Sequence, residues 1–222
     1  MAKRGLFILI LAVLVAGGVF AEMSAGVGLT LGMNLAGVGE AKAGVYTEKI
    51  YPMMPSIFNI GAFGFFDATY VETSVSFFFG FGEATYVGET KDVMITNLSI
   101  GLLGKFPFDI GNGMTIFPAF GVEYQIVLGV SQDDNDFFKD IFRYNAIDMS
   151  AFWIRFGGGL DYKLGGSIFL RGTALYGIRF NNKMESDIDI LWKRDIEDRD
   201  DASYNAGLKH GFVIRAAIGF SF

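Results

Sequence analysis

The sequence predicts an all-β fold, an eight-stranded antiparallel up-and-down barrel, and three observations predict it. Apolar residues recur at every second position in eight separate segments, which is the period of a strand with two different faces. The connections between these segments alternate between short turns and long polar loops, as they do in barrels that cross a membrane. After residue 21, no apolar run is long enough for a membrane-spanning helix.

The composition excludes several other classes of protein. Hydrophobic residues make up 51% of the 222 residues and charged residues 19%, with 30 glycines, 24 phenylalanines and no cysteine. A chain this apolar is not disordered, and one without cysteine has no disulfide framework. The net charge of −6 and the absence of a basic stripe argue against a nucleic-acid partner.

The N-terminus has the parts of a secretory signal peptide. Lys3 and Arg4 precede an apolar stretch over residues 5–15, and small residues precede a cut after Ala21. The competing interpretation is an uncleaved membrane anchor over residues 5–21, which is only slightly short of a membrane span. The short apolar stretch and its cleavage-like end favour the signal peptide. We therefore expect a signal peptide over residues 1–21 and an exported barrel over residues 22–222.

The predicted strands follow in order after the signal peptide. The first, residues 24–35, alternates apolar residues with small or polar ones without a break. Seven more follow, over residues 57–68, 70–83, 93–107, 113–129, 149–164, 167–181 and 210–222. Their bulky apolar residues share one parity; examples are Val75, Phe77, Phe79 and Phe81 in the third strand, and Phe152, Ile154, Phe156, Leu160 and Tyr162 in the sixth.

The connections define two ends of the predicted barrel. Those after the second, fourth and sixth strands are short and made of turn residues, around 67–69, 109–113 and 164–167. The other four, over residues 36–56, 84–92, 130–148 and 182–209, are longer and more polar. Short turns at one end and long loops at the other are typical of outer-membrane barrels.

The side of the barrel that faces outward is decided by its less apolar parity. A soluble barrel covers its exterior with charged residues, but here that parity is mainly Gly, Ser, Thr, Asn and Ala, with charges concentrated in the loops. Eight strands also enclose too little space for the bulky set. We therefore expect the bulky residues to face lipid, which makes the predicted fold a transmembrane β-barrel.

The last strand carries a recognisable ending. Apolar residues occupy alternate positions up to the last residue, among them Phe212, Ile214, Ile218, Phe220 and Phe222. This ending resembles the C-terminal signal that the barrel-assembly machinery reads on bacterial outer-membrane proteins. The whole exported chain resembles the small eight-stranded barrels typified by the OmpA membrane domain, OmpX and OmpW. The resemblance implies location in the bacterial outer membrane, with its lipid and the assembly machinery as partners.

Charged residues on the inward parity predict a network inside the lumen. They are Glu72, Glu123, Arg155, Asp161, Lys163, Arg171, Arg179 and Arg215. Because unpaired buried charges are costly, we expect Glu123 to pair with Arg155 and Asp161 with Arg171. The parity of the last pair requires an odd number of residues in the turn between them, so we predict a three-residue glycine turn with a bulge. Such a network favours a plug over a conducting pore.

The third and fourth long loops carry candidate interaction residues. In the third loop, Asp136 could cap a short helix that places Phe138 and Phe142 on one face; the alternatives are a plain hydrophilic loop, or a calcium site whose spacing matches no EF-hand. In the fourth loop, alternation predicts an extended arm with Ile188, Ile190 and Trp192 along one edge. The alternative there is a solvated acidic tip.

Catalysis has little support in the sequence. The sole histidine, His210, lies at the start of the last strand without a close serine, the nearest upstream being Ser203. Such a histidine is more often a polar cap than a general base. We predict no catalytic residue, metal or cofactor.

The function expected from these observations is non-enzymatic. The chain is predicted to be a monomeric envelope-structural barrel that contacts an extracellular ligand or host surface, in the manner of an adhesin, through its long loops. The alternative is an OmpW-like narrow channel for small hydrophobic molecules. Its lining would be Phe63, Phe65, Phe78, Phe117 and Trp153, if these side chains point inward without filling the lumen.

Overall fold

The computed structural model describes residues 22–43, 46–50, 56–86, 89–132, 150–180, 202–205 and 208–222. The predicted signal peptide, residues 1–21, lies outside these residues. The eight barrel strands are β1 (Met23–Ala36), β4 (Ser56–Ala68), β5 (Val71–Tyr86), β6 (Glu89–Lys105), β8 (Met114–Gln132), β9 (Ala151–Gly165), β10 (Ile168–Phe180) and β12 (Lys209–Ser221). They match the eight predicted segments to within a few residues. Among the described residues, no helix is long and apolar enough to cross a membrane.

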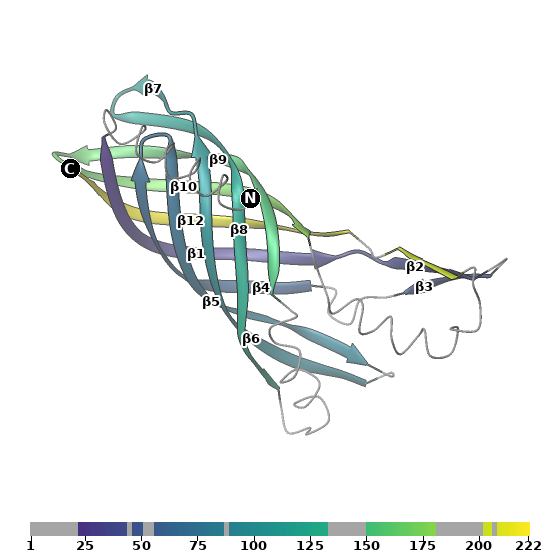
Figure 1. Cartoon of the computed structure of the whole chain (residues 1–222). Coiled ribbons are helices and arrows are strands. Elements are labelled where there is room, and N and C mark those ends of the chain that lie inside the picture. Colours follow the sequence, from purple (N-terminus) through teal and green to yellow (C-terminus); the bar gives the residue numbers. More distant parts are fainter. Residues whose placement is uncertain are drawn as a thin grey trace, which may run out of the picture.

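The eight strands form a closed antiparallel barrel (Figure 1). Each strand pairs with the next barrel strand along the chain, and β1 pairs with β12 over residues 24–36 and 209–221. The pairing of Thr30 with Arg215 belongs to this closing ladder. Closure leaves no sheet edge in the wall, which is the condition for a β-structure to span lipid.

Four further strands lie at the two ends of the barrel. β7 (Phe108–Gly111) folds back on β8 at the end that carries the short turns, which we call the turn end. At the opposite end, the loop end, β2 (Gly39–Ala43), β3 (Tyr46–Ile50) and β11 (Ala202–Asn205) form a separate three-stranded sheet. Figure 1 shows this sheet extending beyond the barrel. The sequence pattern did not predict these three strands, because strands of four or five residues are too short to show a period.

The two parities of each strand face opposite environments, as predicted. The bulky set lies on the outside: Val75, Phe77, Phe79 and Phe81 of β5 are exposed, and so are Phe152, Phe156, Leu160 and Tyr162 of β9. Neighbouring rings on this surface touch, with Phe77 and Phe79 edge to face and 5.3 Å between ring centroids. An uninterrupted exposed apolar wall is unstable in water and stable in hydrocarbon.

The inward parity fills the lumen with smaller and polar side chains and a few aromatic ones. Two apolar clusters lie inside, one of Phe63, Phe65, Phe169 and Ala217, the other of Leu103, Phe117, Ala119 and Leu175. An eight-stranded barrel is just wide enough for side chains to fill it.

Candidate functional site

The lumen contains two groups of charged residues at different heights, all of them buried except Asp161, which is half-buried. We call Asp67, Glu72, Lys105, Asp161 and Arg171 the turn-end layer, and Glu123, Arg155 and Arg215 the mid-lumen layer. The inward parity of seven strands brings these eight side chains together.

Arg171 is the centre of the turn-end layer. Its guanidinium donates two hydrogen bonds to Asp161 on β9, at 2.7 and 2.6 Å. It donates another to Glu72 on β5 and another to Asp67 on β4, both at 2.7 Å. The Nζ of Lys105 on β6 donates to the same oxygen of Asp67. One guanidinium therefore ties β10 to three other strands with charge-assisted hydrogen bonds.

Aromatic rings enclose the same guanidinium. The central carbon of Arg171 lies 4.5 Å from the ring centroid of Phe65 and 5.2 Å from those of Phe117 and Phe169. These cation–π contacts exclude water from the ion pairs, which strengthens them. The ion pairs and the aromatic rings together occupy the lumen at this height.

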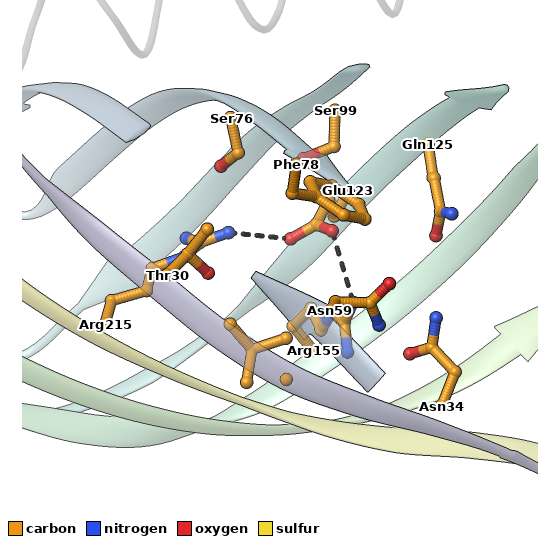
Figure 2. A pocket seen from close by; sticks show the side chains of 12 residues that line it. Thr30, Asn34, Asn59, Ser76, Phe78, Ser99, Glu123, Gln125, Arg155 and Arg215 are labelled. Atoms are coloured by element: carbon orange, nitrogen blue, oxygen red, sulfur yellow. Dashed lines mark hydrogen bonds and ion pairs between the residues drawn. The ribbon is translucent and has the colours of Figure 1, made fainter. Parts of the chain in front are cut away.

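The mid-lumen layer is built on one carboxylate. Glu123 accepts a hydrogen bond from Nη2 of Arg155 at 3.2 Å and another from Nη2 of Arg215 at 2.9 Å. Figure 2 shows the two arginines reaching this carboxylate from different sides. Arg215 also lies 3.4 Å from the hydroxyl of Ser74. Because the three charged residues come from β8, β9 and β12, the layer joins two neighbouring strands to a third that lies beyond β10.

A neutral hydrogen-bond chain continues toward the loop end. The indole of Trp153 donates to Gln125 at 3.0 Å, and Gln125 donates to Asn97 at 2.8 Å. Asn97 in turn donates to the carbonyl of Ile95 at 3.2 Å. The sequence pattern predicted an inward position for Trp153 but not its hydrogen bonds to this chain, although Asn97 and Gln125 also have the inward parity.

The space left between these side chains is small. One cavity, at the turn end beside Asp161 and Arg171, has a volume of about 120 Å³. The second, in the mid-lumen layer, has about 20 Å³. A water molecule needs roughly 10–15 Å³ on this measure, so the mid-lumen cavity has room for about one water and the turn-end cavity for several.

The eight charged residues named from the sequence have different positions in the structure. Six lie in the two layers: Glu72, Glu123, Arg155, Asp161, Arg171 and Arg215. Lys163 is exposed at the turn end, where it lines the larger cavity. Arg179 is half-buried near the loop end, opposite Trp153 in the β9–β10 ladder.

Two members of the turn-end layer were not among the residues named from the sequence. Asp67 and Lys105 are both 3% exposed and paired. They stand beside the turns, where charged residues are usually solvated, and the turn predicted around 67–69 includes Asp67. Their parity was the available signal. Asp67 lies on the same face of its strand as Phe63 and Phe65, and Lys105 lies on the same face as Leu103.

The turn between Asp161 and Arg171 differs from the prediction in one detail. The two residues are cross-strand partners, and the register shifts by one residue at the turn, which is a bulge. The turn itself has two residues, Gly166 and Ser167, and the extra residue is Leu164 in β9. Gly165 (φ 141°) and Gly166 (φ 57°) have backbone conformations that favour glycine. The odd number of residues between Asp161 and Arg171 comes from the bulge in β9 and not from the turn.

The aromatic residues proposed to line a channel point inward and are buried. They are Phe63, Phe65, Phe78, Phe117 and Trp153, with exposures of 1–7%. They pack against the charged layers, with Arg155 lying 4.3 Å from the ring of Trp153 and Arg215 5.2 Å from that of Phe63. They occupy the lumen rather than surround an open space.

The remaining candidate residues lie on the exterior or outside the described residues. Phe212, Ile214, Ile218, Phe220 and Phe222 are exposed along the outer face and end of β12. His210 stands at the start of β12, and its ring centroid is 5.7 Å from that of Tyr176. The loop residues Phe138, Phe142, Ile188, Ile190 and Trp192 lie outside the described residues.

A closed barrel with an apolar outer surface and a polar, filled lumen defines the class of protein. Lipid can surround a β-structure only if every wall strand is paired, as it is here. The chain is an integral membrane β-barrel of the small, eight-stranded kind.

Comparison with known proteins finds similar solved structures. No protein-family model and no curated protein sequence matches the chain. The chain is similar to neisserial surface protein A (8% identity, TM-score 0.42; 90% of this chain and 99% of that one), and to OprG of Pseudomonas aeruginosa (9%, 0.49; 93% and 98%). It is also similar to Ail of Yersinia pestis (14%, 0.32; 90% and 99%). At these identities and scores the likeness is one of strand arrangement.

Proposed function

We propose that the chain is a non-enzymatic, monomeric envelope barrel that is braced by its closed lumen and contacts an extracellular ligand or host surface through its loop end. The observation that carries this proposal is the contrast between the lumen and the loop end of the barrel. The lumen is occupied by two ion-pair layers and buried aromatic residues, whereas the loop end builds a sheet beyond the barrel. We infer that interaction is concentrated at the loop end.

The protruding sheet offers strand edges to a binding partner. It joins the first long loop, which supplies β2 and β3, to the fourth, which supplies β11. Among the described residues it ends on β3 and β11, and strands at a sheet edge offer backbone donors and acceptors to a partner. We call these three strands the arm.

Removing the arm tests the surface-interaction role. Replacing residues 39–50 with a short glycine-serine linker deletes β2 and β3 and leaves every barrel strand intact. We expect cells displaying this variant to attach severalfold less to host cells or matrix than cells displaying the unaltered barrel. The matched control inserts the same linker in the turn between Thr69 and Tyr70, at the other end of the barrel. Equal attachment by all three would contradict the role of the arm.

Planar-bilayer recording tests the closed lumen. We expect the refolded barrel to give no large, stable channel, because ion pairs and buried aromatic residues occupy the lumen and the mid-lumen cavity has room for about one water. A porin in the same bilayer provides the positive control. The transport alternative has less support, since its aromatic lining is buried against the ion pairs; stable openings, or uptake of small hydrophobic molecules, would favour it.

A further inference from the structure

The mid-lumen layer encloses a cavity of about 20 Å³, which is lined by both of its arginines and by Glu123. Figure 2 shows the carboxylate of Glu123 between these residues, with the two arginines on one side of it and the hydroxyl-bearing Ser76 and Ser99 on the other. The volume is enough for one particle of about the size of a water molecule. All five of these side chains are buried.

Polar atoms without a hydrogen-bond partner gather on the side chains that line this cavity. Among the described residues, these atoms include Nε and Nη1 of Arg155, Nε of Arg215, and the hydroxyl oxygens of Ser76 and Ser99. The pattern follows from how Glu123 is bound, since it accepts only from the two Nη2 atoms. Other N–H groups of both guanidiniums therefore have no hydrogen-bond acceptor. Each such buried donor destabilises the fold unless something accepts its hydrogen bond.

The charges of this layer do not balance. Two guanidiniums face one carboxylate, which leaves an excess of one positive charge in a region screened from solvent. The turn-end layer has the opposite imbalance, with Lys105 and Arg171 against three carboxylates. The two imbalances offset each other between the layers, but within the mid-lumen layer itself the positive charge is in excess. A bound water would accept hydrogen bonds in the mid-lumen cavity without changing this, whereas an anion would accept them and balance the charge of the layer.

We propose that the mid-lumen cavity binds a single monatomic anion, chloride under ordinary conditions. Free guanidinium N–H groups of Arg155 and Arg215 and the hydroxyls of Ser76 and Ser99 would hold it. Phosphate, sulfate and carboxylate ligands are too large for a space of about 20 Å³. The anion would complete the brace between β8, β9 and β12, and its site is independent of anything that the loops bind.

Bromide substitution tests the site directly. The full barrel is refolded and crystallised with bromide in place of chloride, and anomalous scattering is recorded at the bromine edge. We expect one anomalous peak in the lumen between Arg155 and Arg215. Density there without an anomalous signal, or bromide bound only on the exterior, would overturn the proposal in favour of water.

A solution measurement accompanies the crystals. The temperature at which the folded gel band is lost is compared in sodium chloride and in sodium gluconate at equal ionic strength, with gluconate too large to enter. We expect chloride to raise this temperature by several degrees in the unaltered barrel. The rise should disappear in Arg215→Met, which removes the excess charge and keeps the pair between Glu123 and Arg155. It should persist in Lys163→Met, which removes a cation at the exposed turn end.

The two variants keep the proposal falsifiable. An equal effect of chloride in all three proteins, or none in the unaltered barrel, would show that halide acts elsewhere or not at all. If Arg215→Met does not fold, the double variant Ser76→Ala/Ser99→Ala replaces it. That variant keeps every ion pair and removes two donors, so we expect a weaker dependence on chloride concentration; an unchanged dependence would count against the site.

Discussion

Arg171 shows how a single side chain can brace a barrel. It contacts carboxylates of three other strands, and its exposure is only 3%. Removing one partner from a buried ionic group leaves the others uncompensated, which costs about 3–5 kcal/mol. We expect Arg171→Met to destabilise the barrel by about that amount, measured by urea unfolding in lipid vesicles. Lys163→Met, in which the cation is exposed, should change stability by about 0.5 kcal/mol or less; equal losses would refute the bracing role.

Single strand pairs depend on glycine where two strands approach closely. A Cβ added at Gly121 of β8 would lie 2.0 Å from the carbonyl oxygen of Leu102 and 2.7 Å from Cα of Leu103, both in β6. These are backbone atoms and cannot move aside without breaking the ladder. We expect Gly121→Val to prevent assembly of the β6–β8 pair, so that little folded protein forms. Gly172→Val in β10 is the matched control, because nothing lies within 4 Å of its added Cβ; a folded yield as low as that of Gly121→Val would contradict this account.

The whole molecule behaves as one closed unit, because the wall has no free edge. We expect the protein to fractionate with outer membranes, and the unheated sample to migrate differently from the heated one on a denaturing gel. The physical reason is that every wall strand must separate before the closed barrel can expand to the size of an unfolded chain. A soluble fraction without a gel shift would contradict the membrane assignment.

The sequence by itself determined the strands and their two faces. Alternation is a local property, so Phe77 and Phe79 could be assigned to lipid and Glu123 and Arg155 to the lumen without knowledge of the neighbours of each strand. The short turns and long loops likewise follow from local residues. The sheet of β2, β3 and β11 was not predicted, because each of these strands has too few residues to show a period.

Only the tertiary structure decided which buried charges meet. Arg171 pairs with Asp67, 104 residues away, and Arg215 pairs with Glu123, 92 residues away. Parity places all four in the lumen but does not give their heights. The heights depend on the stagger that accumulates around eight tilted strands when β1 closes on β12, and that quantity belongs to the whole barrel. The same closure left two arginines around one carboxylate, and with them the cavity for an anion.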